Sequence, residues 1–94
     1  MEIEIREREN KGFALATEKD EKAGMMTYSI AGKELIIIDH TEVEEAFKGR
    51  EVGKKMLYAI VEMARDKGVK ILPLCPFAHS MFKKLDDIKD VLKS

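Results

Sequence analysis

Several features that mark particular classes of protein are scarce or missing in this sequence. The chain has one cysteine, Cys75, which excludes an internal disulfide and fits a reducing cytoplasm. Apolar runs such as residues 35–38 are far shorter than the roughly 20 residues that a membrane-spanning helix needs. The first residues alternate between acidic and apolar side chains, unlike a secretory signal peptide. We therefore expect a cytoplasmic protein that does not enter the membrane.

A large excess of charge of either sign is also missing. There are 17 basic and 18 acidic residues and a net charge of -1, whereas a general nucleic-acid binder normally carries a large basic excess. The two histidines and one cysteine lack the spacing of zinc ligands, so we expect no metal site. With 94 residues, 45% apolar and 37% charged, the composition is typical of one small globular domain covering residues 1–94.

The first half of the chain predicts four β-strands. Polar and apolar residues alternate in residues 1–8, with Ile3 and Ile5 on one face, and this is typical of a half-buried strand. The predicted strands are residues 1–8, 13–18, 25–31 and 34–43. The connections between them are short, the longest being a polar loop at residues 19–24. Strands joined in this way predict an antiparallel meander.

The second half begins with a long helix. Apolar residues recur every three or four positions over residues 51–67, and Gly68 is a natural helix end. Residues 69–74 predict a short strand in which Pro73 cannot donate to a neighbour, so this strand lies at an edge of the sheet or is distorted near its end. Because strand 35–43 and strand 69–74 are joined through the helix, we expect them to be parallel and the crossover to be right-handed.

Two short helices are predicted to follow. The first starts at Pro76, since proline is favoured in the first turn of a helix, and the second comprises about residues 86–92.

Four cations crowd the turn before the long helix and its first turn. They are Lys48, Arg50, Lys54 and Lys55. Cations oppose the partial positive charge of a helix N-terminus, whereas free N–H groups there bind phosphates well. Ligands of parallel crossovers bind beyond the carboxyl ends of the strands, where this turn and Cys75 should meet. The sequence therefore predicts a site for a phosphate-bearing ligand, the alternative being an ordinary solvated basic turn.

The residues of this turn resemble a known family. The segment Thr41-Glu42-Val43 followed by EEAFKGREVGKKML resembles the acetyl-CoA-binding motif of the GNAT superfamily of N-acetyltransferases, and CPFAHSMFKK is similar to its final motif. DHTEV, GREVGKKML and PLCPF together look like small, single-domain GNAT-like proteins that lack the N-terminal helices of larger members. The resemblance covers most of the chain. It implies an α/β (α+β) GNAT-like fold, with a mixed, mostly antiparallel sheet of about five strands, one main crossover helix and short C-terminal helices.

The resemblance also implies a cofactor, acetyl-CoA. Backbone N–H groups of the turn would hold its pyrophosphate, and the strand end would pair with its pantetheine arm. The turn residues are Lys48, Gly49, Arg50, Glu51, Val52, Gly53 and Lys54, and the strand residues are Thr41, Glu42 and Val43. Four positions depart from the family pattern. Lys48 replaces the usual Arg or Gln, and Glu51 replaces a glycine. Cys75 replaces an asparagine, and Phe82 replaces a tyrosine that often acts as general acid.

Two residues are the main catalytic candidates. Cys75 precedes a helix N-terminus, which favours a thiolate, so it could accept an acyl group or protonate the leaving thiolate. Alternatively it is a small buried residue. His40 could act as a general base, or it could be a structural histidine hydrogen-bonded at a strand bulge. His79 is a weaker candidate that could face the same cleft.

These observations lead to an expected function. The preferred hypothesis is acetyl-CoA-dependent N-acetyl transfer to a primary amine, either of a small molecule or of a lysine or N-terminus of a protein. The alternative is a non-catalytic acyl-CoA-binding or protein-interaction module, because the usual tyrosine is missing and little chain remains to shape an amine pocket. Alternating charges on the edge strand 1–8 discourage pairing between copies, which favours a monomer.

Overall fold

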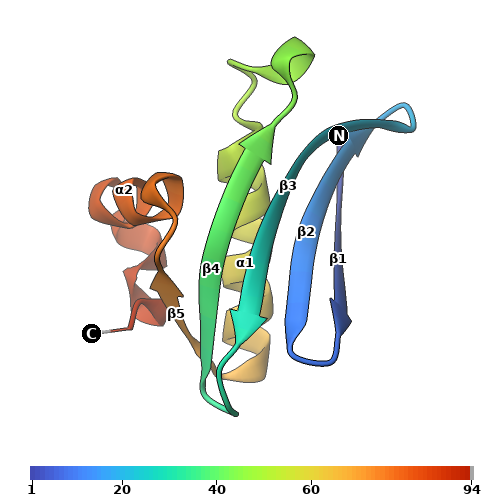
Figure 1. Ribbon diagram of the computed structural model, residues 1–94. Helices are drawn as coiled ribbons and strands as arrows, with labels where there is room; N and C mark the ends of the chain where they lie inside the picture. The colour runs from blue at the N-terminus through green and yellow to red at the C-terminus, as the bar shows by residue number, and fades with distance from the viewer. Residues whose placement is uncertain (94) are drawn as a thin grey trace.

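The computed structural model describes residues 1–93 and contains a five-stranded mixed sheet (Figure 1). The strand order along the sheet follows the order along the chain. The strands are β1 (Glu2–Arg8), β2 (Lys11–Glu18), β3 (Glu21–Ile30), β4 (Leu35–Val43) and β5 (Lys70–Pro73). The first four form an antiparallel meander and β4 pairs with β5 in parallel, as the sequence predicts.

One long helix covers one face of the sheet. It is α1 (Val52–Lys67), which contacts all five strands and is seen behind β3 and β4 in Figure 1. It ends at Gly68, whose φ of 71° is easy for glycine and whose N–H donates to the carbonyls of Ala64 and Arg65. The predicted crossover and the predicted helix end are therefore confirmed.

Three shorter helical segments complete the chain. They are η1 (Glu45–Phe47), α2 (Pro76–Lys84) and η2 (Asp86–Val91). The proline at the start of α2 lies in the predicted first-turn position. The last segment is a 3-10 helix rather than an α-helix, and it packs against α1. None of the helices in residues 1–93 is long and apolar enough to cross a membrane.

The core lies between the sheet and α1. Alternate residues of β2, β3 and β4 face the helix and are buried, and they meet the apolar stripe of α1. The sheet contributes Ala14, Ala16, Met26, Tyr28, Ile36 and Ile38, and the helix contributes Val52, Met56, Leu57, Ile60, Val61 and Ala64. In β2 the larger Phe13 and Leu15 are therefore on the other face, where they are half-buried.

The predicted polar loop at residues 19–24 is wrong. β2 and β3 continue almost to their junction, and only Lys19 and Asp20 form the turn. Both turn residues have positive φ, 52° and 68°, the combination that a tight two-residue hairpin turn uses. Such turns usually contain glycine or asparagine, and neither residue occurs at positions 19 and 20.

Candidate active site

The site begins where β4 and β5 part. The two strands pair only from Leu35 with Lys70 to Ile38 with Pro73. The N–H groups of Leu74 and Cys75 then both donate to the carbonyl of Ile38, at 3.1 and 3.2 Å. After this shared acceptor the chain turns away into α2, whereas β4 continues to Val43. Among the described residues, the last part of β4 therefore has no partner strand on its β5 side.

A bulge in β4 decides which backbone groups face this unpaired edge. In the pairing with β3, Tyr28 lies opposite Ile38 and Thr27 opposite His40, so Asp39 is the inserted residue. The N–H of the next residue after the strand, Glu44, donates to Ala23 on the β3 side at 2.8 Å. Backbone groups alternate in direction along a strand. The backbone N–H and C=O groups of Thr41 and of Val43, the last residue of β4, therefore point to the unpaired edge.

The same alternation separates the side chains of β4. Thr41 lies opposite Met26 and so shares the α1 side of the sheet, whereas His40 and Glu42 are on the face away from α1. Glu42 is ion-paired with Lys22 at 2.7 Å, and its backbone groups point toward β3. Of the three strand residues predicted to hold the cofactor, Thr41 and Val43 thus direct their backbone groups to the unpaired edge, and Glu42 directs its backbone groups to β3.

The N-terminus of α1 lies beside this edge and has no cap. Glu51 precedes the helix, and its side chain makes no capping hydrogen bond. The first backbone hydrogen bond of the helix is from the N–H of Lys55 to the carbonyl of Glu51, at 3.0 Å. The N–H groups of Val52, Gly53 and Lys54 precede that bond and are free to bind an anion. No acidic residue lies in the first turn of the helix to compete with such a ligand.

A cavity of about 310 Å³ opens over this helix start. Its lining joins the end of β4, the turn, the first turn of α1 and one face of α2. The lining residues are Val43, Phe47, Lys48, Gly49, Glu51, Val52, Gly53, Lys54, Phe77 and Met81. Seven of these are among the predicted cofactor residues, and Thr41, Glu42 and Arg50 lie outside the lining.

Arg50 is held away from the cavity. Its guanidinium is ion-paired with Glu18 at the end of β2, and it lies over the ring of Phe47, 5.1 Å from the ring centroid. This hydrogen bond is the main reason why the pKa of the Glu18 carboxyl is lowered. Lys48 and Lys54 remain at the cavity, each with one exposed carboxylate within 4 Å, those of Glu45 and Glu51.

Glu51 adopts an unusual backbone conformation. Its φ of 60° and ψ of 30° lie in the left-handed region, which glycine enters freely and other residues enter at a cost. Its side chain is 69% exposed and lies 3.8 Å from the ammonium of Lys54. The position that resembles a motif glycine therefore keeps the backbone shape of a glycine, while its carboxylate is directed to solvent. Gly49, two residues earlier, also has a positive φ, 83°.

Phe77 and Met81 are site residues that the sequence analysis missed. A Cβ at Gly53 would lie 2.6 Å from the Phe77 ring, so a larger residue at this helix position would have to displace the ring. The ring is 36% exposed and forms a wall of the cavity. A glycine inside a helix that has no conformational need for it is the signal that could have indicated a close neighbour.

The side chain of Cys75, which follows β5, contacts the end of β4. Its side chain is almost fully buried, 3% exposed, on the α1 side of the sheet. The sulfur is 3.1 Å from the hydroxyl oxygen of Thr41, and it accepts the N–H of Ala78 at 3.5 Å, which caps α2. The burial of the thiol agrees with a structural role for Cys75. Its contact with a polar group at the unpaired edge agrees with a chemical role.

Within residues 1–93, no tyrosine lies at the cavity to act as the general acid that the family's tyrosine often provides. Phe82 is buried in the core at 2% exposure. The hydroxyl of Tyr28 donates to Glu7, and burial together with this bond raises its pKa. The hydroxyl of Tyr58 donates to Asp87, which raises the pKa of that tyrosine too. Both phenols are therefore weaker acids than usual, and neither lines the cavity.

Neither histidine lines the cavity over the helix start. His40 is exposed on the open face of the sheet, and its side chain has no hydrogen bond to another described residue. It lies one residue beyond the bulge, close to where β4 and β5 part. His79 is exposed on α2. In residues 1–93 there is no group of three or more side chains that could hold a metal ion.

Comparison with known proteins identifies the family. The profile of the GCN5-related N-acetyl-transferase family matches residues 12–91, which is most of the chain. The chain belongs to this family. A GCN5-like protein from Staphylococcus aureus, solved in solution by NMR, has 37% sequence identity and a TM-score of 0.72, with 97% of this chain and 88% of that chain covered. The predicted resemblance and the predicted fold are therefore confirmed.

Two more distant relatives place the chain in a wider context. Protein NATD1 of Danio rerio is 23% identical over 78 residues, which are 83% of this chain and 71% of that protein. A structure from Bacillus anthracis that contains acetyl coenzyme A has a TM-score of 0.63 at 15% identity, with 82% of this chain and 46% of that chain covered. At that identity the likeness concerns the fold alone. Acetyl transfer from acetyl-CoA is the general chemistry of the GCN5-related N-acetyltransferases, and this chain is an acetyltransferase domain of that family.

Proposed function

We propose that this chain transfers an acetyl group from acetyl-CoA to a primary amine, using the parted end of β4 and the N-terminus of α1. The observation that carries the proposal is that two sets of backbone groups without hydrogen-bond partners in residues 1–93, at the start of α1 and along the end of β4, lie side by side. The free N–H groups at the start of α1 suit a pyrophosphate, and the unpaired edge of β4 suits an amide-containing arm. The cavity of about 310 Å³ that joins them gives the cofactor a place to lie.

Each part of the cofactor has candidate partners in the chain. The N–H groups of Val52, Gly53 and Lys54 would hold the pyrophosphate, with the ammonium groups of Lys48 and Lys54 adding charge. The backbone of Thr41 and Val43 would hold the pantetheine arm. When bound, the thioester supplies an electrophilic carbonyl carbon, to which the amine nitrogen bonds as the carbon–sulfur bond breaks.

The residues around the parting of the strands suit the proton transfers that this reaction needs. An amine must be neutral to attack, and His40 could take its proton directly or through a water. The N–H of Val43, which points to the unpaired edge, could donate to the developing oxyanion. The leaving thiolate needs a proton, for which the Cys75 thiol and the Thr41 hydroxyl are the nearest donors at this edge.

Turnover tests the proposal. Purified protein is incubated with acetyl-CoA and a panel of amines, including short peptides, and free thiol is measured with a chromogenic disulfide. We expect amine-dependent thiol release that His40→Gln reduces, while the Kd for acetyl-CoA stays unchanged, and that added imidazole partly restores. If acetyl-CoA produces no thermal shift and no thiol release, the proposal is wrong.

A non-catalytic acyl-CoA-binding module is the second candidate. The burial of Phe82 favours it, because the position resembling the general acid is occupied by a side chain that cannot donate a proton. This candidate predicts the same thermal shift with acetyl-CoA but no thiol release with any amine. Intact-mass measurement after incubation with acetyl-CoA also tests Cys75, because an acetyl adduct that is absent in Cys75→Ala would assign an acyl-accepting role to the thiol.

A further inference from the structure

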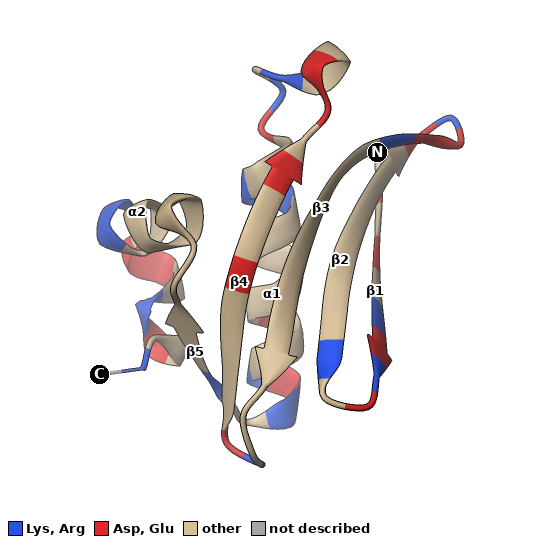
Figure 2. Cartoon of the chain, in the orientation of Figure 1, with Lys and Arg blue, Asp and Glu red and all other residues tan. Residues whose placement is uncertain are grey.

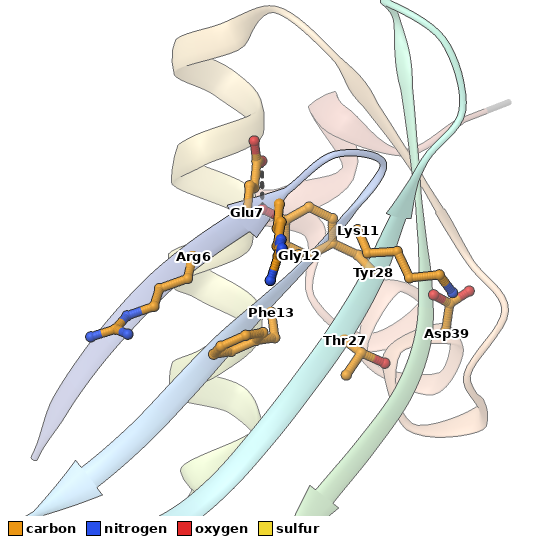
Figure 3. Close-up of a pocket in the computed structure, with 9 residues that line it drawn as sticks. Arg6, Glu7, Lys11, Gly12, Phe13, Thr27, Tyr28 and Asp39 are labelled. Carbon is orange, nitrogen blue, oxygen red and sulfur yellow. Dashed lines mark hydrogen bonds between the residues drawn. The ribbon is translucent and has the colours of Figure 1, made fainter.

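The face of the sheet away from α1 carries a second and larger hollow, of about 600 Å³ (Figure 3). In Figure 3, Phe13 and Thr27 lie in front of their strands and α1 is behind them. The hollow is lined by Arg6, Glu7, Arg8, Lys11, Gly12, Phe13, Thr27, Tyr28 and Asp39. It is distinct from the cavity at the start of α1, with which it shares no residue.

This hollow reaches the parting of β4 and β5. Asp39, the inserted residue of the bulge, lines it and directly follows Ile38, the shared acceptor at the parting. Thr27 also lines it and lies opposite His40 in the β3–β4 register. A molecule in the hollow would therefore have one end at the place where the proposed acetyl transfer occurs.

A straight row of side chains leads from His40 across the sheet. Phe13 lies opposite both Thr27 and Arg6, so the row runs His40, Thr27, Phe13, Arg6 over four strands. Neighbouring strands are about 4.8 Å apart, so the row spans about 14 Å. An extended polypeptide advances about 3.3 Å per residue, and about four residues would cover that distance.

The far part of this row is cationic. Arg8 lies opposite Lys11 in the next cross-strand position, and both line the hollow together with Arg6. The blue segments of β1 and β2 in Figure 2 mark where basic residues lie on these strands, and the Lys11 side chain extends from β2 toward Asp39 in Figure 3. Within residues 1–93, neither Arg8 nor Lys11 has a carboxylate within ion-pairing distance. Arg6 has an exposed partner, Glu4, at 3.1 Å.

The carboxylates of the hollow are already engaged. Glu7 accepts hydrogen bonds from Tyr28 and Lys67, and Asp39 accepts one from Ser29 at 2.7 Å. Within residues 1–93, Arg8 and Lys11 are therefore the charged groups of the hollow left to interact with a ligand. The hollow is open to solvent rather than enclosed, and its half-buried floor residues Phe13 and Thr27 offer an apolar strip.

We propose that this hollow binds the acceptor as an extended polypeptide with acidic side chains three to four residues from the acetylated amine, an inference that rests on the proposed acetyl transfer. The amine would lie at the parting of β4 and β5 beside His40, the chain would cross Thr27 and Phe13, and the acidic residues would meet Lys11, Arg8 and Arg6. Such charge complementarity sets partner choice and association rate, and it weakens with salt.

Three peptides of equal length test the acceptor class. Each has one lysine, with aspartate, serine or arginine at the third and fourth positions on both sides. We expect the acidic peptide to have a kcat/KM above that of the serine peptide by about fivefold or more at low salt, with the arginine peptide lowest. The double variant Arg8→Glu with Lys11→Glu should reverse this order, whereas Lys93→Glu, a single charge reversal beyond the far edge of the sheet, should preserve it.

A binding measurement separates this inference from the proposed function. The same acidic peptide with its lysine already acetylated cannot accept a group, and fluorescence anisotropy should show that it binds the wild type and binds the Arg8/Lys11 variant more weakly. Equal turnover of the three peptides, or faster turnover of a small cationic amine than of any peptide, would overturn the inference and leave acetyl transfer intact. No turnover with any amine, but selective binding of the acidic peptide, would overturn the proposed function and retain the groove.

Discussion

Glu51 allows the turn that carries the proposed pyrophosphate site to be tested in two independent ways. The residue is at φ 60° and ψ 30°, where a non-glycine residue costs about 1–2 kcal/mol. Glycine removes this strain but restores some chain entropy to the unfolded state, about 0.5–1 kcal/mol. Glu51→Gly should therefore stabilise the free protein by about 0.5–1 kcal/mol, which corresponds to about 2–8 °C in Tm for a domain of this size.

The carboxylate of Glu51 has a separate effect on an anionic ligand. Like charges 4 Å apart in water repel by about 1 kcal/mol, and by about half as much at twice that distance. The side chain is 69% exposed, so solvent and salt reduce this repulsion. Removing the charge should tighten coenzyme A binding by about two- to fivefold at low salt.

Glu51→Gln separates the two effects, because it removes the charge and keeps a non-glycine backbone. We expect Glu51→Gly to raise both Tm and the affinity for coenzyme A, and Glu51→Gln to raise the affinity alone. Thermal unfolding without ligand and calorimetric titration with coenzyme A measure the two quantities. A Tm that falls in Glu51→Gly would refute the left-handed conformation, and unchanged affinity in both variants would refute a phosphate site at this turn.

Three further predictions concern the walls of the site and the frame of the sheet. Gly53→Ala should displace the ring of Phe77, lower stability by about 1–3 kcal/mol and weaken coenzyme A binding, and adding Phe77→Ala should recover part of the Tm. Cys75→Ser should keep the cap of α2 and the fold but lose most turnover, and full turnover would limit the cysteine to capping. Tyr28→Phe removes a hydrogen bond that is the largest cause of the lowered pKa of Glu7, so it should lower Tm at pH 7. That bond stabilises the folded state above the ordinary Glu pKa of 4.5 and fades as pH falls through the lowered one, so the Tm values of wild type and Tyr28→Phe should converge in acid, and a constant difference would contradict this origin.

The parts of the fold that depend on local patterns were predictable from the sequence. Alternation gave the strands, the helical periodicity gave α1, and Gly68 and Pro76 marked helix boundaries that the structure has. The start of α1 beside the cation-rich turn was also predictable, whereas the binding of an anion there stays a prediction. The two-residue turn at Lys19 and Asp20 was missed because its positive φ values are imposed by the twist of the paired strands and by no residue preference.

The parts of the site that depend on contacts between distant residues were not predictable. Nothing near Arg50 indicates that Glu18 withdraws its guanidinium from the cavity. Gly53 signals a close neighbour, but nothing near it in sequence indicates that the neighbour is Phe77, because the two are brought together only by the path of the chain through β5. Sequence patterns report burial and direction within one element, whereas these contacts are set by packing between elements.

The bulge at Asp39 determines which way the backbone groups and side chains of residues 40–43 point at the proposed site. Without the inserted residue, the alternation from Ile38 would turn the backbone groups of His40 and Glu42, instead of those of Thr41 and Val43, to the unpaired edge. With it, Thr41 meets Cys75 on the α1 side while His40 faces the open side. The two candidate catalytic side chains are thus on opposite faces, and the parting of β4 from β5 is where both faces are accessible. In the proposed reaction, an amine arriving from the open face and a cofactor lying along the α1 side would then meet only there, which would let so small a domain keep the two proposed binding sites apart.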